Sequence, residues 1–313
     1  MPSFSSRLAH RLAYATGWST RRAKRLGEMR ILMLHGVGDR DFPSEDFERV
    51  LVFLERHFEL ISLGELVHRT VSRLRIQGRE IALTFDDGLR NNATVAYPLL
   101  REMNVPATFF LCPTLIDEGH WLWNHEARAR LESMDDHVCA RFRESLAFTP
   151  PERGETEADA VVEGMKTLGL PRRQEIEASI RRETHEFMPL PVHRRAYDPL
   201  DWEEIRRLDP ELITIGSHTL THPILPNLND ADLNVEIRGS RHRLETVLRR
   251  KVEFFCYPNG ERDERAHALV RETYRAAVTT RPGTVSVGAH LHSLPRIGVC
   301  TKRSTMAWRL ARP

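Results

Sequence analysis

The stretch that decides the fold is EIALTFDDGLRNNATVAYPLLREMNVPATFFLC, residues 80–112. It opens with a compact apolar run, residues 80–85, that stops at an Asp-Asp-Gly turn, which is typical of a buried strand. Residues 93–103 predict a helix that Pro98 must kink or shorten. Residues 105–112 predict a second buried strand. Strand, helix and strand within about thirty residues indicate a βαβ unit with parallel strands.

The alternation of strand and helix continues on both sides of this unit. Strands are predicted at 29–37, 211–218, 252–260, 275–280 and 292–299, and helices at 44–58, 230–250 and 265–274. Repeated βα units imply a parallel sheet or barrel, in which sites gather at the carboxyl ends of the strands. We therefore expect an α/β fold with its chemistry at that edge.

One long stretch, residues 113–200, departs from this alternation. It is rich in Arg and Glu and has helical periodicity, with apolar residues such as Val161 and Met165 on one face. We interpret it as a helical insertion within a catalytic domain of residues 30–313. A basic N-terminal segment, residues 1–29, precedes that domain.

The overall composition excludes some classes of protein. Among the 313 residues, 46 Lys and Arg nearly balance 44 Asp and Glu, so the net charge of +2 gives no reason to expect a nucleic-acid partner. No apolar run approaches the roughly 18 residues of a membrane-spanning helix. The four cysteines form no CxxC pair, which argues against a thiolate zinc site.

The basic N-terminal segment lacks the uninterrupted apolar core of a secretory signal, since Arg11 and Gly17 break it. We therefore predict a cytoplasmic protein. Leu8, Leu12 and Ala15 share one helical face, which would suit a weak peripheral contact with anionic lipid at the inner membrane face. A helix that packs on the domain is the alternative interpretation.

Two short motifs carry the chemistry. In TFDDG, residues 84–88, two adjacent carboxylates at a strand end are costly without a cation or hydrogen-bond donors, although an ordinary acidic turn would read the same way. In HTLTHP, residues 218–223, two histidines four residues apart have a common metal-ligand spacing, with a capping or surface pair as the alternative. Two histidines and one aspartate would leave coordination positions open, as a catalytic metal site requires.

These two motifs resemble the first two motifs of the polysaccharide deacetylases, the NodB-homology group or carbohydrate esterase family 4. The resemblance covers roughly residues 30–112 and 200–300. It implies a distorted (β/α) barrel of the NodB-homology type and one divalent metal ion, usually Zn²⁺. Carried over by position, the metal ligands would be Asp87, His218 and His222. Asp86 would be the general base that takes a proton from the attacking water.

The later motifs of the family are less faithful. Where many members have Arg-x-Pro-Tyr-Gly, this chain has CYPNG, residues 256–260, so that Cys256 replaces the arginine and Asn259 the tyrosine. We assign Tyr257 and Asn259 to substrate or oxyanion binding, since the backbone N–H of Asn259 is a suitable donor. Arg296, in LPRI, is our candidate for the missing arginine.

The family's Leu-x-His motif, whose histidine protonates the leaving amine, is not reproduced either. Its nearest equivalent is His292, directly after Leu291. We take His292 as the acid, with a plain loop histidine as the alternative. His35, after the first predicted strand, also opens toward the expected site and is a candidate substrate contact.

The sequence thus predicts a metal-dependent hydrolase that removes the N-acetyl group from a sugar or an intracellular glycan precursor and releases acetate. The expected partner is an N-acetylated carbohydrate. Two alternatives stay open. One is a carbohydrate-binding or scaffold protein on the same fold that has lost turnover, and the other is a metal-dependent hydrolase of a different amide or ester.

Overall fold

The computed structural model describes residues 4–39, 42–72, 76–152 and 154–312. Its centre is a parallel sheet with the strand order β7-β6-β5-β4-β3-β1-β8, and β2 pairs with β3 beside this path. The strands are β1 (Arg30–Leu34), β2 (Glu59–Leu60), β3 (Glu80–Phe85), β4 (Ala107–Leu111), β5 (Ile213–Ser217), β6 (Phe254–Cys256), β7 (Ala276–Val278) and β8 (Ile297–Gly298). The predicted βαβ unit is present as β3 and β4, paired in parallel with Thr84 opposite Thr108.

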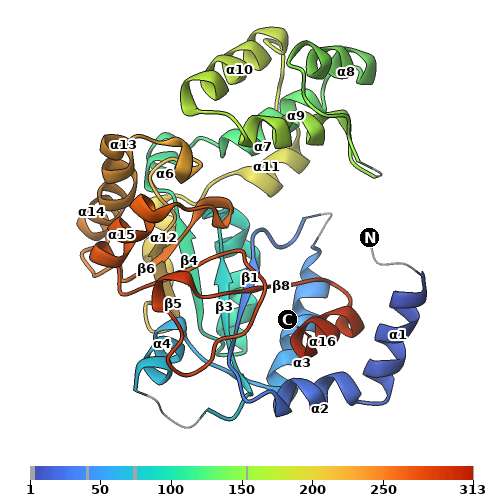
Figure 1. The fold of residues 1–313 in the computed structure, drawn as a ribbon, viewed down its shortest axis with the longest axis vertical. Helices are drawn as coiled ribbons and strands as arrows, with labels where there is room; N and C mark the ends of the chain where they lie inside the picture. Colours follow the sequence, from blue (N-terminus) through green and yellow to red (C-terminus); the bar gives the residue numbers. More distant parts are fainter. Residues whose placement is uncertain (1–3, 40–41, 73–75, 153, 313) are drawn as a thin grey trace.

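A single segment near the C-terminus joins the two ends of the sheet. Leu294 forms a parallel bridge with Val278 of β7, and β8, three residues later in the chain, pairs with β1. The sheet therefore curls into the distorted (β/α) barrel that the resemblance implied (Figure 1). The predicted strand at 292–299 is shorter than expected, because Leu291–Ser293 form a 3₁₀ turn.

Helices cover the outside of the sheet. They are α3 (Ser44–His57), α5 (Tyr97–Glu102), α12 (Trp202–Arg207), α13 (Asp230–Asn234), α14 (Ser240–Leu248) and α15 (Glu264–Thr273). Helix α4 (Leu63–Val71) packs on the inner face instead, in one cluster with Ile31 and Ala82. Pro98 lacks an N–H group, and a π-helical turn at Asn92–Ala96 precedes it, so α5 is short, as predicted. The helix predicted at 230–250 contains a second π-helical turn, Val235–Gly239, between α13 and α14.

The stretch predicted as an insertion is helical. It contains α6 (Pro113–Glu118), α7 (Trp123–Leu131), α8 (Asp136–Ser145), α9 (Glu157–Lys166), α10 (Leu170–Glu183) and α11 (Pro191–Tyr197). Helices α7 to α10 have a hydrophobic core of their own, which includes Val161, Val162 and Met165 of the predicted apolar face. In Figure 1 they form a lobe beyond one end of the sheet.

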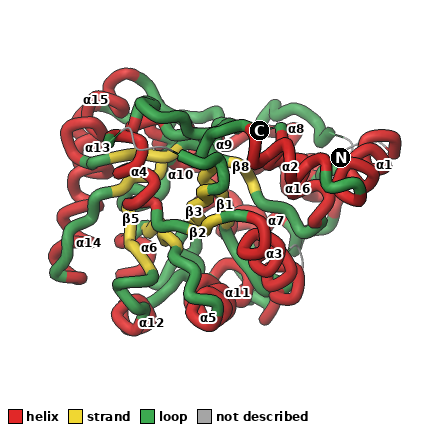
Figure 2. Tube along the Cα trace, turned by 90° about the horizontal axis from the view of Figure 1, so that it is seen from below, coloured by secondary structure: helices red, strands yellow, loops and turns green. Residues whose placement is uncertain are grey.

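The basic N-terminal segment packs against the C-terminus. Its helices α1 (Phe4–Ala15) and α2 (Trp18–Arg25) lie beside α16 (Arg303–Ala311) at one end of the molecule (Figure 2). The buried guanidinium of Arg30, in β1, donates hydrogen bonds to the backbone carbonyls of Ala23 and Leu310. These bonds connect α2 and α16 to β1. Leu8 and Leu12 are 51% and 59% exposed, so their face of α1 is not part of this packing. None of the described helices has the length and apolar character needed to cross a membrane.

Candidate metal centre and active site

The site begins where β3 ends, at two buried carboxylates. Asp86 is 2% exposed and Asp87 is 7% exposed. Asp87 adopts φ = 73°, a left-handed conformation that costs a non-glycine residue free energy, and Gly88 follows with φ = 63°. This turn sends the two carboxylates to different partners: Asp86 pairs with an arginine, while Asp87 faces histidines. The two adjacent acids therefore have separate environments.

Asp87 and the two histidines of the HTLTHP motif form a compact group of possible metal ligands. Oδ1 of Asp87 lies 3.5 Å from Nε2 of His218 and 3.6 Å from Nε2 of His222. All three side chains are buried. Ligand atoms bound tetrahedrally at about 2.0–2.2 Å from one zinc ion are about 3.3–3.6 Å apart, so these residues fit such an ion.

Hydrogen bonding orients His218 for this role. Its Nδ1 lies 2.7 Å from the backbone oxygen of Cys256, which fixes the N–H on Nδ1 and turns Nε2 toward Asp87. Burial opposes a positive charge on the ring, but the negative groups around it outweigh burial and raise the pKa of His218 well above its ordinary value. Burial also opposes ionisation of Asp87, but the neighbouring histidines lower its pKa. Burial lowers the pKa of His222 to about 3, so this ring stays neutral beside His218.

Asp86 forms a buried ion pair with Arg296, which stands just before β8. The two guanidinium N–H groups donate to the two carboxylate oxygens at 2.7 Å and 2.6 Å. Burial opposes ionisation of Asp86, but the charge and hydrogen bonds of Arg296 outweigh it and lower the pKa of Asp86. Arg296 is thus in contact with the predicted base, as the sequence hypothesis required.

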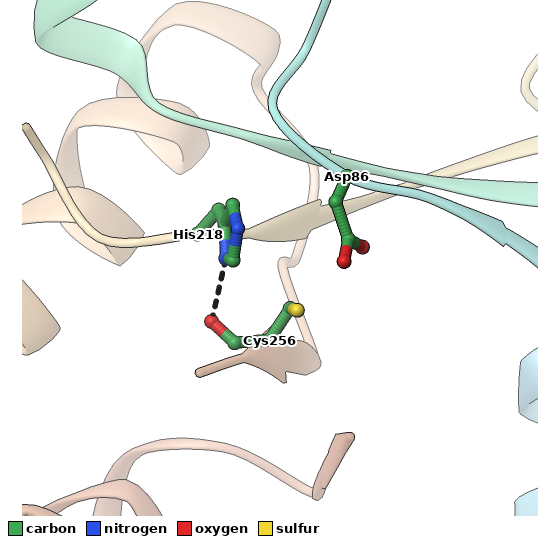
Figure 3. Close-up of side chains that lie close together, drawn as sticks. All are labelled: Asp86, His218 and Cys256. Atoms are coloured by element: carbon green, nitrogen blue, oxygen red, sulfur yellow. Dashed lines mark hydrogen bonds between the residues drawn. The ribbon is translucent and has the colours of Figure 1, made fainter. Parts of the chain in front are cut away.

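Figure 3 shows that Asp86, His218 and Cys256 also converge. Their ligand atoms are close enough to be considered for a second ion. However, Nη2 of Arg296 lies 2.6 Å from Asp86 and 3.1 Å from Sγ of Cys256, so a guanidinium already supplies the positive charge there. The small Cys256 side chain leaves room for this arginine to approach from another strand. Of the two groups, Asp87, His218 and His222 are therefore the better candidate for holding a metal ion.

The histidine loop is held by groups far away in the sequence. Glu236 accepts hydrogen bonds from the backbone N–H groups of Leu220 and Thr221. Trp123, the first residue of α7, donates its indole N–H to the backbone oxygen of His222 at 3.2 Å. The insertion is therefore in contact with the metal-ligand loop.

The same helix brings a histidine that sequence reasoning missed. Nε2 of His125 lies 3.9 Å from Oδ2 of Asp87, and the ring stacks on Tyr197 of α11 with the centroids 4.6 Å apart. Burial lowers the pKa of His125 to about 4, which keeps the ring neutral at pH 7. No motif signalled this residue, because it lies in a helical stretch with no barrel pattern.

His35 follows β1 and is exposed. Its charge helps to lower the pKa of both Asp86 and Asp87, although burial and their direct partners act more strongly. Asn259, after β6, has φ = 52° and a buried Nδ2 with no hydrogen-bond partner among the described residues. Both residues stand at the carboxyl end of the sheet, where they were predicted.

Two predicted site residues lie elsewhere. The Tyr257 hydroxyl lies 3.3 Å from Nδ1 of His267 on α15 and donates to the backbone oxygen of His292, so its ring is buried in the core. Nε2 of His292 lies 2.9 Å from the backbone oxygen of Tyr274, which precedes β7 and so belongs to the opposite end of the parallel strands. The structure therefore places Tyr257 and His292 away from the group around Asp87, and the roles predicted for them are not carried into the site.

Together, fold and site define a hydrolase-like centre: a parallel barrel with a buried Asp-His-His group that could hold a metal ion, next to a carboxylate paired with arginine. The family model of the polysaccharide deacetylases matches residues 75–278. This chain belongs to the polysaccharide deacetylase family, which confirms the resemblance and supports carbohydrate deacetylation as its general activity.

Individual relatives are distant. The Bacillus subtilis protein YxkH, which its name places in the same family, is 19% identical over 283 residues, or 89% of this chain and 74% of that protein. The Streptococcus pyogenes deacetylase PplD in complex with acetate has 16% identity and a TM-score of 0.60, and the match covers 91% of this chain and 99% of PplD. IcaB from Ammonifex degensii has 14% identity and a TM-score of 0.62, covering 92% and 98%. At these identities the two structures support the fold alone.

Proposed function

We propose that this protein is a metal-dependent N-deacetylase of an N-acetylated sugar or glycan precursor and that its ion is Zn²⁺. The observation that carries the proposal is the buried donor set of Asp87, His218 and His222, directly beside the Asp86–Arg296 pair. Such a set has open positions when it holds an ion, as catalytic zinc sites do. When bound there, a divalent ion would acidify a water molecule and polarise the acetamide carbonyl.

The chain's own residues divide the remaining work. Asp86 accepts the proton of the attacking water, and Arg296 positions its carboxylate and keeps it ionised before the attack. We assign the backbone N–H of Asn259, in the turn that follows β6, to stabilising the oxyanion of the tetrahedral intermediate.

The leaving amine needs a proton donor other than His292. We assign this role to His35, because it is exposed at the same end of the sheet and acts electrostatically on both carboxylates. His125, held neutral and stacked on Tyr197, suits the positioning of substrate instead. His35→Ala should lower kcat, whereas His125→Ala should mainly raise KM.

A cytoplasmic location and an intracellular, nucleotide-linked or lipid-linked precursor as substrate stay part of the proposal. The basic segment supplies charge that would suit weak contact with an anionic membrane surface. We expect the full chain to float with vesicles of anionic lipid and not with vesicles of neutral lipid. Binding to neither kind of vesicle would remove membrane contact from the proposal.

The central test measures zinc content and acetate release on the same protein. Purified chain should hold about one zinc ion and release acetate from at least one N-acetylhexosamine derivative, in a panel that also contains simple amides and esters. Asp86→Asn should keep the zinc and lose about 10²–10⁴-fold in kcat, and His218→Ala should lose both. Glu48→Gln, which removes an exposed carboxylate on α3, is the matched control and should change neither.

The alternatives predict different results. A scaffold protein would bind zinc and sugar but release no acetate from any compound. A hydrolase of another class would release acetate from simple esters or amides and not from sugars. Either result would contradict the proposal.

A further inference from the structure

A cavity of about 500 Å³ lies in the insertion, between α7, α10 and α11. Its wall includes the aromatic rings of Trp121 and Phe187 and three arginines, Arg130, Arg181 and Arg194. Ligand pockets for sugars and other small molecules have this size and this mixture of aromatic surface with a few polar groups. Neither the metal centre nor the barrel motifs account for it.

The cavity is next to the active site. Asp198, which lines it, accepts a hydrogen bond on its backbone oxygen from the backbone N–H of Arg90, and Leu200 donates to the backbone oxygen of Gly88. The segment carrying Asp198 is therefore paired with the residues that directly follow Asp87. On the other side, α7 contributes Glu126 to the cavity wall and its neighbour His125 to the site.

Aromatic rings connect the two places. His125 stacks on Tyr197 at 4.6 Å, and Trp121 meets Tyr197 edge-on at 5.5 Å. His193 continues the series, stacked between Tyr197 at 6.4 Å and Phe187 at 5.9 Å. Trp121 and Phe187 in the cavity wall are thus linked by direct ring contacts to His125 beside Asp87.

The charges in the cavity do not cancel. Glu126 accepts hydrogen bonds from both Arg130, at 2.8 Å, and Arg181, at 2.7 Å, and Arg181 also lies 3.9 Å from Glu177, which is outside the cavity wall. Asp198 is engaged by the indole N–H of Trp121 at 2.8 Å. Within the part of the chain that the structure describes, the guanidinium of Arg194 has no ion pair or hydrogen bond, and its side chain is exposed. The cavity wall thus has more arginines than acidic residues, and the unpaired guanidinium of Arg194 is suited to bind a carboxylate or phosphate group.

We propose that this cavity binds an anionic group of the substrate, so that the enzyme selects an N-acetylated sugar linked to a carboxylate-bearing or phosphate-bearing unit. Arg194 is the residue that contacts the anion, and Trp121 provides the stacking surface for the adjoining sugar. The inference rests on the proposed function for its choice of ligand, but binding can be measured without turnover.

The test uses the full-length chain after chelator treatment, so that affinity is measured by calorimetric titration in the absence of catalysis. Three probes separate the possibilities: a tetrasaccharide of alternating glucuronate and N-acetylglucosamine, the uncharged tetramer of N-acetylglucosamine, and UDP-N-acetylglucosamine. At least one anionic probe should bind about tenfold more tightly than the uncharged tetramer. Which of the two anionic probes does so distinguishes a carboxylate ligand from a phosphate ligand.

Arg194→Ala should weaken binding of the preferred anionic probe about tenfold and leave the uncharged tetramer unchanged. Arg195→Ala is the matched control, because it removes the same charge from the next residue of α11, which does not line the cavity. Trp121→Ala should weaken all the probes that bind. Equal effects of the two arginine variants, or no preference for either anionic probe, would overturn the proposal.

Acetate release, measured in parallel with zinc restored, keeps this result separate from the proposed function. Anion preference without acetate release would support the cavity and contradict the deacetylase. Acetate release without anion preference would support the deacetylase and contradict the role proposed for the cavity.

Discussion

Replacing Arg296 by methionine should destabilise the protein strongly. The guanidinium is fully buried and pairs with both oxygens of Asp86, which is itself 2% exposed. Methionine has a similar length but no charge, so the variant leaves a carboxylate buried without its counter-ion. Removing one partner of a buried ion pair costs about 3–5 kcal/mol. At about 2 °C per kcal/mol for a chain of this size, Tm should fall by about 6–10 °C.

A double variant identifies the source of that loss. In Arg296→Met combined with Asp86→Asn, the side chain left behind is neutral, so the double variant should be more stable than Arg296→Met alone. Arg238→Met is the matched control, because its ion pair with Glu272 has the same 2.7 Å length but both partners are more than half exposed. An exposed pair contributes about 0–1 kcal/mol.

The assay is urea unfolding and thermal unfolding of chelator-treated protein at pH 7, followed by circular dichroism. The metal is removed so that differences in metal binding between variants do not contribute to the measured stability. If Arg296→Met lost no more stability than Arg238→Met, or if adding Asp86→Asn made the protein less stable still, the buried pair would not have the energetic role assigned to it.

Three further predictions concern other positions. Glu80, buried at the start of β3, accepts two backbone N–H groups that lower its pKa against the effect of burial, so Glu80→Gln should cost about 1–3 kcal/mol at pH 7. Because the folded-state pKa is lowered, that stabilisation is present above about pH 4.5 and disappears as the pH falls further, so wild type and variant should converge in acid unfolding curves. Gly260→Ala should cost about 2 kcal/mol or more in urea unfolding, because φ is +75° and the new Cβ would collide with Thr280. Zinc at 100 times its Kd should stabilise the wild type by about 2.7 kcal/mol in thermal shift assays, and His222→Ala should lose this gain while the exposed His242→Ala keeps it.

The sequence by itself determined the local parts of this protein. Strand and helix periods are properties of neighbouring residues, so the βαβ unit around TFDDG and the helical character of residues 113–200 were predicted correctly. Asp87, His218 and His222 could be selected because each stands at a strand end and the carboxyl ends of parallel strands share one edge. Their roles in binding metal stay a prediction.

Tertiary structure alone decided which distant side chains complete the site. Arg296 reaches Asp86 across 210 residues of sequence, and His125 reaches Asp87 from a helix outside the barrel pattern. Tyr257 is a residue that the sequence suggested for the site and that the structure places outside it. Successive side chains of an extended segment point to opposite faces, so Cys256 faces Arg296 while Tyr257 enters the core beneath α15. A three-residue strand is too short to reveal that alternation in sequence, and only the packed barrel fixes which face is which.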